Sequence, residues 1–452
     1  MTAHGLVTEG GSPVAPRRAA HGRATRAAAR GRLRARTAAS AALLVVASTL
    51  VGCSSSSSNA TGSHSSCATG VPGVTGDSIK IGLVLPDTGG PVAEAFRPAR
   101  GAVEARIDKE NATGGVYGRK IDLMWRDDEG DPGVFTTAVQ SLVENDQVFG
   151  LIAQSVSLTD ESASWLQTKG VPVTGLSSSP IWSNYSNLFH YGSLYNKGGA
   201  VDTFGRYVKA QGGTRALLVI DPTSATSVDL AGQLAPSLRS QGVTVVGQTS
   251  YSADISDPAK VATLLRQDRA DTLIGATQAD AFIEIYATAK AAGIDLKVAL
   301  SSSNYGPTEI QQRGKDMAGM SMTMAFQSYT TDSPAIRAYR EAMTTYSPET
   351  TSLFDDVAIV SYVAADEMIK GLQLAGPCPT RQSFITNLRK VTSYDAGGIL
   401  APTNLSKPHD PVSCFNFLKV SATGDSYSTV PGNTPTGFWC GNPVPASAIT
   451  GS

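Results

Sequence analysis

Short, continuous apolar runs alternate along residues 79–326 with segments whose apolar residues recur at helical spacing. Runs rich in β-branched residues and bounded by Gly or Pro, such as 79–85, predict buried strands. Apolar residues three or four positions apart, such as Ala99, Val103 and Ile107, predict amphipathic helices, and Gly114 ends the first of them. Continuous apolar strands that alternate with helices are typical of parallel sheets covered on both faces. We therefore expect an α/β protein.

The predicted elements form two successive series, which predict two doubly wound lobes. The first series has strands at 79–85, 121–125, 148–153 and 171–174, with helices that carry Ala99 to Ile107, Phe135 to Val143, and 159–169. The second has helices at 198–211, 227–240, 258–268 and 279–292, with strands at 216–220, 243–248, 272–275 and 297–300. A strand at 320–326 and helices at 333–346, 354–374 and 380–391 follow.

A C-terminal hairpin is predicted from a strand at 414–420, a long turn at 424–437 and a strand at 438–440. An antiparallel hairpin would place Cys414 near Cys440, within the short Cα separation that a disulfide requires. The other two cysteines after residue 53 are Cys67 and Cys378, which we expect to form a second disulfide. An even cysteine count in an exported chain favours this arrangement, and four free thiols are the alternative.

The N-terminal 52 residues have the features of a secretory signal. Eight arginines lie between Arg17 and Arg36, and an uncharged run of 13 residues, 38–50, follows them. This run is shorter than the roughly 20 residues of a transmembrane helix. Leu50-Val51-Gly52-Cys53 resembles the bacterial lipobox, which implies that Cys53 is acylated and begins the mature protein, with 53–76 as a tether. The alternative is that Cys53 is only a small apolar residue near a cleavage site elsewhere.

Charge and composition exclude several classes of function. Without residues 1–52 the chain has 29 basic and 37 acidic residues, a net charge of about −8. An acidic surface argues against nucleic-acid partners. Only His190 and His409 lie within the predicted folded region, and no phosphate-binding, dinucleotide, metalloprotease or nucleophile-elbow motif occurs. We expect no cofactor, no metal and no enzymatic activity, a strand position with a local hydrogen bond for His190, and a solvated turn for the acidic run 127–131.

Polar residues follow several predicted strands directly. In open α/β sheets, ligands bind beyond the carboxyl ends of the strands. Serine hydroxyls and amides at that edge either cap helices or bind polar groups of a ligand. The candidates are Asp87, Gln154, Ser155, Ser157, Ser177, Ser178 and Ser179 in the first lobe, Thr226, Gln278 and Asn304 in the second, and Phe96, Tyr195 and Phe326 as aromatic walls, which are equally compatible with the core.

The motifs resemble those of a known family. These are Ile79-Lys80-Ile81-Gly82, Asp87-Thr88-Gly89-Gly90, residues 111–121 with the sequence NATGGVYGRKI, and Asp127-Asp128 with Asp131-Pro132. They look like type I substrate-binding proteins of ABC importers, and most closely like the branched-chain amino acid (Leu/Ile/Val)-binding family. The resemblance implies two Rossmann-like lobes with parallel-rich sheets, joined by a three-crossover hinge around a ligand cleft. Lobe I would comprise 77–193 and about 327–392, and lobe II 194–326 and about 393–445.

The family's ligand-binding positions are only partly matched here. Its first-lobe loops fall on 154–157 and 177–179, whereas its second-lobe tyrosine would fall near Thr226 and a further aromatic residue on Gln278. Its acidic residue for a ligand ammonium would fall within 301–304, which contains no acid. An ammonium buried without a carboxylate costs several kcal/mol. These departures favour a neutral or anionic ligand, such as an amide, a carboxylate or an aromatic acid, unless Asp87 or Asp355 supplies the charge.

The resemblance implies a lipid-anchored, monomeric receptor at the outer face of the cell membrane. Such a receptor captures a small polar solute, which is an amino acid, an amide or a small carboxylate, and delivers it to an ABC permease. Two other hypotheses remain open at this point. One is a ligand sensor for a signalling partner, and the other is an extracellular α/β enzyme, which fold alone does not exclude.

Overall fold

The computed structural model describes residues 70–191, 199–253, 255–303 and 306–445. The predicted signal, residues 53–69 of the predicted tether with Cys53 and Cys67, and the candidates Tyr195 and Asn304 lie outside these residues. Residues 70–76 of the predicted tether are described and contact the first sheet, since Val74 forms a bridge with Ile79 and Lys80 N donates to Gly73 O (2.8 Å). None of the helices in the described ranges is both long enough and apolar enough to cross a membrane.

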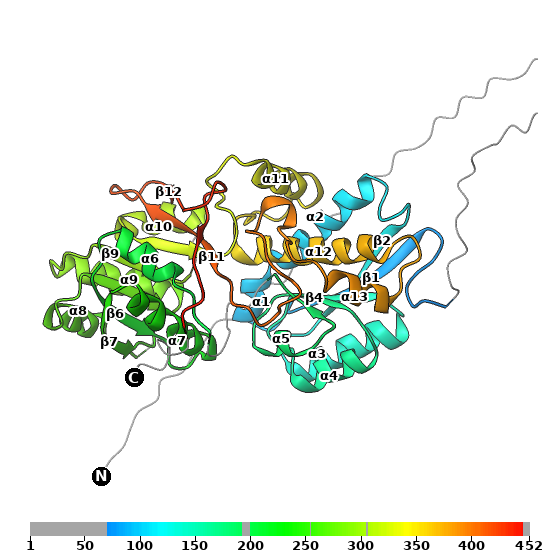
Figure 1. The fold of residues 1–452 in the computed structure, drawn as a ribbon, viewed down its shortest axis with the longest axis horizontal. Helices are drawn as coiled ribbons and strands as arrows, with labels where there is room; N and C mark the ends of the chain where they lie inside the picture. Colours follow the sequence, from blue (N-terminus) through cyan, green and yellow to red (C-terminus); the bar gives the residue numbers. More distant parts are fainter. Residues whose placement is uncertain (1–69, 192–198, 254, 304–305, 446–452) are drawn as a thin grey trace, which may run out of the picture. The chain divides into compact units, whose positions relative to one another are not determined.

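The first sheet is wholly parallel and has the strand order β2-β1-β3-β4-β5 (Figure 1). Alternate residues of β1 face opposite layers of helices, because successive side chains of a strand point to opposite faces. Ile81 and Leu83 join the core with α2 and α12, whereas Val84 packs with α3 and α4. The elements are β1 (Ser78–Leu85), α1 (Pro91–Phe96), α2 (Ala99–Ala112), β2 (Lys120–Asp127), α3 (Pro132–Gln140), a π-helical turn (Ser141–Asn145), β3 (Gly150–Ala153), α4 (Asp160–Thr168), β4 (Val173–Gly175), α5 (Ile181–Asn184) and β5 (Leu188–Phe189).

The second sheet has the order β12-β11-β10-β9-β8-β6-β7, and β13 pairs with β11 beside β12. Strands β6 to β10 are parallel, and β11 pairs in the antiparallel direction with both β10 and the edge strand β12. The elements are α6 (Thr203–Ala210), β6 (Arg215–Ile220), α7 (Ala225–Ser240), β7 (Thr244–Ser250), α8 (Pro258–Gln267), β8 (Thr272–Ala276), α9 (Ala279–Ala291), β9 (Val298–Ser301), α10 (Pro307–Met317), β10 (Ser321–Met324), β11 (Cys414–Val420), β12 (Tyr427–Val430) and β13 (Trp439–Cys440).

Three later helices return to the first sheet. These are α11 (Pro334–Tyr346), α12 (Asp356–Ala375) and α13 (Arg381–Leu388), followed by a 3-10 turn (Ala396–Gly398). Helix α12 lies against α2 and β4 (Figure 1). Thr174 Oγ1 donates to Ala364 O over 2.8 Å, and Arg106 forms an ion pair with Asp366 over 2.8 Å. The α/β fold with two parallel-rich sheets, predicted from the alternation of strands and helices, is confirmed.

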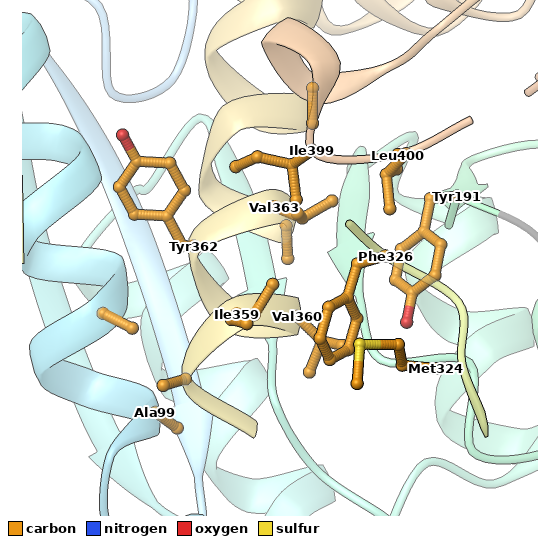
Figure 2. Close-up of a cluster of buried hydrophobic side chains, with 14 of the residues drawn as sticks. Ala99, Tyr191, Met324, Phe326, Ile359, Val360, Tyr362, Val363, Ile399 and Leu400 are labelled. Atoms are coloured by element: carbon orange, nitrogen blue, oxygen red, sulfur yellow. The ribbon is translucent and has the colours of Figure 1, made fainter. Parts of the chain in front are cut away.

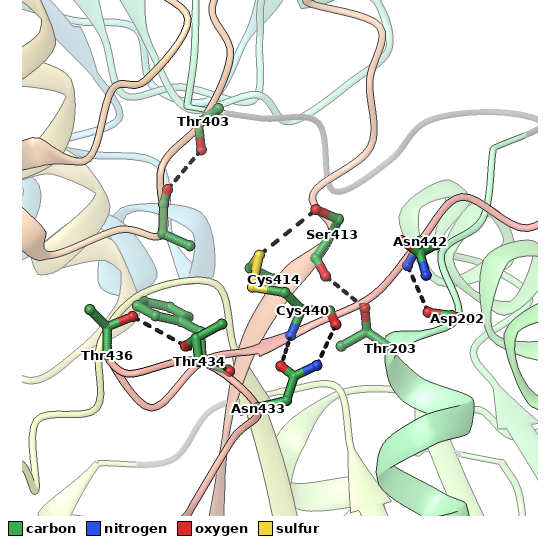
Figure 3. The surroundings of a disulfide bond; sticks show 12 residues. Asp202, Thr203, Thr403, Ser413, Cys414, Asn433, Thr434, Thr436, Cys440 and Asn442 are labelled. Carbon is green, nitrogen blue, oxygen red and sulfur yellow. Dashed lines mark hydrogen bonds between the residues drawn. A yellow bond between two sulfur atoms is a disulfide. The ribbon is translucent and has the colours of Figure 1, made fainter.

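A disulfide joins Cys414 and Cys440, the pair that the predicted hairpin places together (Figure 3). The two residues face each other across β11 and β13, with their Cα atoms 4.0 Å apart. The side chain of Asn433 also fixes the backbone of Cys440. Its Oδ1 accepts from Cys440 N (2.7 Å), and its Nδ2 donates to Cys440 O (2.9 Å). Cys378 is disulfide-bonded as well. Its pairing with Cys67 stays a prediction, since Cys67 is outside the described residues.

Several local predictions were wrong. The long turn predicted at 424–437 contains strand β12, whose residues pair with β11. Helix α6 begins at Thr203 instead of residue 198, and β10 ends at Met324, two residues short of the prediction. Helices α1, α5 and α10 were not predicted, because two of them are very short and α10 is polar along most of its length.

Candidate functional site

The loops that follow β3 and β4 contact each other at the carboxyl edge of the first sheet. Ser178 Oγ donates to Ser155 O over 3.3 Å. Gln154 is fully buried, and its Oε1 accepts a hydrogen bond from Ser361 Oγ of helix α12 (3.0 Å). Tertiary packing therefore brings the two serine-containing loops into one polar cluster beside α12.

This cluster holds several buried hydrogen-bonding atoms that have no partner among the described residues. They are Gln154 Nε2, Ser157 Oγ, Ser177 Oγ, Ser179 Oγ and Trp182 Nε1. Buried polar groups in folded proteins are nearly always hydrogen-bonded, and an unsatisfied one costs about 1–3 kcal/mol. Such atoms concentrated at one sheet edge offer hydrogen bonds that the fold itself does not use.

The hydroxyl of Ser155 is used in a hydrogen bond within the protein. It donates to the Asp128 carboxylate, which is fully buried and also accepts from Gly130 N (2.9 Å). Burial raises the pKa of Asp128 above its ordinary value, although the hydrogen bond from Ser155 acts in the opposite direction. The prediction that the acidic run 127–131 is a solvated turn is therefore wrong for Asp128. Asp131 does cap α3, as its Oδ1 accepts from Gly133 N (2.7 Å).

The loop that carries Asp87 is exposed and is fixed by the neighbouring strand β2. The Asp127 carboxylate accepts from Asp87 N (2.9 Å), Thr88 N (3.1 Å) and Glu129 N (2.8 Å). Partial burial would raise the pKa of Asp127, but these hydrogen bonds and one from the Thr88 hydroxyl lower it below its usual value. The loop backbone is held in place while the side chain of Asp87 remains exposed.

A polar pocket of about 280 Å³ lies at the carboxyl ends of β6, β8 and β9. It brings together Thr226 and Gln278, both of which were candidates. Ser303 also lines it, and its Oγ donates to Thr277 O over 3.0 Å. The remaining lining residues are Asp221, Ser224, Ser227, Leu230, Ala276, Thr277 and Ser302.

An apolar cavity of about 200 Å³ adjoins this pocket, since Leu230 and Ser302 line both. Phe326 lies in its wall, and Figure 2 shows Phe326 grouped with Tyr191 and Met324 beside Val360 of α12. The other lining residues are Leu176 after β4, Phe204, Gln233, Thr323, Ala325, Asp356, Val357, Val412 and Phe415.

The remaining candidates lie elsewhere. Phe96 is a core residue of the first lobe, with 5% of its surface exposed, which is the alternative that the sequence left open. His190 is buried directly after β5, so the predicted strand position is wrong, whereas the predicted local hydrogen bond agrees with the 3.4 Å between its Nε2 and Ser183 Oγ. Across the described parts of the chain, no group of His, Cys, Asp and Glu side chains could hold a metal ion.

Thr323 and Asp356 are cavity residues that sequence reasoning missed. Thr323 lies inside β10, whereas the candidates were sought in the loops that follow strands. Asp356 lies within the helix predicted at 354–374, beside Asp355, for which the sequence suggests a role as a source of negative charge. The available sequence signal was the pair of acids at the start of a long apolar helix. Acidic residues are favoured at helix N-termini, so this pair marked the helix start where Asp356 lies. Asp355 itself caps α12 by accepting from Val357 N (2.9 Å).

The two sheets and the helices that cover them have counterparts among known proteins. Residues 78–425 match the family model described as periplasmic binding protein. No curated protein matches the chain significantly.

Solved structures share the fold at low sequence identity. A putative branched-chain amino acid ABC transporter protein from Rhodospirillum rubrum is 19% identical, with a TM-score of 0.65 over 78% of this chain and all of that one. A fatty acid ABC transporter substrate-binding protein from Thermomonospora curvata is 17% identical, with a TM-score of 0.63 over 80% and 93% of the two chains. A solute-binding protein from R. palustris in complex with benzoate is 15% identical, with a TM-score of 0.61 over 80% and 97%.

The family match extends across both sheets, from the first residue of β1 to the loop between β11 and β12. The solved structures have the same type I architecture, which agrees with the fold that the sequence motifs implied. The chain belongs to the periplasmic binding protein family.

Proposed function

We propose that this protein is the solute-binding component of an ABC importer, anchored outside the cell membrane through an acylated Cys53. It captures a small solute at the carboxyl edges of its two sheets and delivers it to a permease. Ligand that touches both lobes favours the closed state, because only differential contacts shift such an equilibrium. Structural relatives that bind fatty acid or benzoate support a solute range wider than amino acids.

The observation that carries this proposal is the set of unpartnered buried donors after β3 and β4. Ser157, Ser177, Ser179, Gln154 and Trp182 all present an O–H or N–H that the described residues leave without an acceptor. A ligand carboxylate, carbonyl or hydroxyl would accept from such groups. An α/β enzyme would need an activated nucleophile or a general base at this edge. His190 follows β5 there and its Nε2 lies 3.4 Å from Ser183 Oγ, but the Ser183 hydroxyl donates its proton to Pro408 O (2.7 Å).

Binding of small molecules to the purified protein tests the proposal. A thermal-shift screen against amino acids, amides, carboxylates, aromatic acids, amines and sugars should yield at least one stabilising compound. At 100 times its Kd, a ligand stabilises the folded state by about 2.7 kcal/mol. If no solute in the screen stabilises the protein, the proposed function is wrong.

Ser177→Ala combined with Ser179→Ala is expected to weaken binding of that solute by roughly 5- to 10-fold per lost hydrogen bond. Folding should be unharmed, since neither hydroxyl has a hydrogen-bond partner within the described part of the chain. Ser164→Ala on the exposed face of α4 is the matched control and should leave affinity unchanged. Isothermal titration calorimetry measures all three proteins, and equal affinities would remove these serines from the site.

A further inference from the structure

The apolar cavity beside α12 has the size and lining of a site for the body of a small ligand. Its volume is about 200 Å³, and an apolar protein cavity of about 150 Å³ is enough for benzene. Four aromatic side chains, Tyr191, Phe204, Phe326 and Phe415, form much of its wall. The faces of aromatic rings attract cations as well as apolar groups.

One polar group in this wall is left without a partner. Thr323 is 8% exposed, and its hydroxyl makes no hydrogen bond with the described residues. A buried hydroxyl in that state normally finds a partner in water or a ligand. Thr323 therefore marks a point in the cavity where a bound molecule would be held.

All the charged residues that line this cavity and its two neighbouring pockets are acidic, among the residues that the structure describes. Asp356, in the first turn of α12, lines the apolar cavity. Asp221 lines the adjoining polar pocket, and Asp355 and Glu309 line a third pocket that shares Asp356. The described lining residues of these three pockets include no Lys, Arg or His. A carboxylate of the ligand would meet repulsion here, whereas an ammonium would be attracted.

We propose that the ligand carries a protonated amine on an apolar body. Asp356 binds the amine, and the aromatic cavity that contains Thr323 encloses the body. This inference rests on the proposed solute-binding function and narrows its substrate class. It also reverses the preference for a neutral or anionic ligand, which came from the missing acid at 301–304. The carboxylate comes from α12 instead of the loop after β9.

Matched ligands that differ in one group test the inference by calorimetry. The amines are isopentylamine and 2-phenylethylamine, the anions are 4-methylpentanoate and 3-phenylpropanoate, the neutral forms are the two corresponding amides, and leucine carries both charges. We expect the amine-bearing compounds to bind and the anions to bind at least 10-fold more weakly. Asp356→Asn should lower amine affinity by 10- to 100-fold, and Thr323→Val should lower it by several-fold.

Glu341→Gln is the matched control, since it removes one negative charge from an exposed position of α11 that lines none of these three pockets. Its affinity for the amines should equal that of the wild type, and circular dichroism should show that all variants fold. Equal losses of amine affinity in Glu341→Gln and Asp356→Asn would overturn the role of Asp356. Binding confined to compounds without an amine would overturn the inference and leave the receptor function intact. Failure of every compound, both in this set and in the wider screen, would overturn both proposals.

Discussion

Replacing Glu367 with glutamine is expected to stabilise the protein at pH 8 by on the order of 4 kcal/mol and to change its stability by less than about 1 kcal/mol at pH 5. Glu367 lies on α12 with 1% of its surface exposed, and neither carboxylate oxygen has a hydrogen-bond partner among the described residues. Burial raises its pKa to about 8, although the Arg389 guanidinium acts in the opposite direction.

The sign follows from proton linkage. The pKa of this glutamate is about 8 in the folded state and 4.5 at its ordinary value, so the folded state retains a proton that the unfolded state releases. Stability therefore falls as pH rises from about 4.5 to about 8. Glutamine keeps the shape of the protonated acid without titrating, which removes this loss.

Urea denaturation of both proteins at pH 5, 6, 7 and 8 measures the effect. Glu341→Gln, which removes an exposed glutamate from α11, controls for the loss of one negative charge. Parallel pH profiles for the wild type and Glu367→Gln would show that the buried carboxyl does not titrate as proposed.

Replacing Cys414 and Cys440 together with alanine is expected to lower the free energy of unfolding by about 3 kcal/mol. The disulfide closes a loop between residues 26 apart in sequence, and its removal frees that loop in the unfolded state. The strands alone hold the loop weakly, because β13 has only two residues. The free end would affect the base of α6, where Thr203 Oγ1 donates to Ser413 O (2.6 Å).

Chemical denaturation in the presence and absence of a reductant measures this effect. Without reductant, the double variant should unfold at a lower denaturant concentration than the wild type. With reductant, the denaturant concentration at which the wild type unfolds should fall at least as far, since Cys378 is also disulfide-bonded and would be reduced as well. Wild-type stability in the double variant under oxidising conditions would show that the hairpin hydrogen bonds suffice without the crosslink.

The sequence by itself determined the fold class and most of its elements. Buried parallel strands must be apolar on both faces, so β1 and β6 stand out as continuous runs, and the helices between them show one apolar face each. The sequence also predicted the Cys414–Cys440 disulfide. The two cysteines lie at the two ends of one predicted hairpin, so the signal is local. The polar loops after β3 and β4 were also visible, since they follow those strands directly.

Only the tertiary structure decided which polar groups are used by the fold and which face the cavities. Ser155 and Ser157 look alike in sequence, yet the first is bound to the buried Asp128 and the second is unpartnered. Thr323 and Asp356 lie on separate elements, 33 positions apart in sequence, and line one cavity. Hydrogen bonding and burial depend on neighbours distant in the chain, and no local pattern records them.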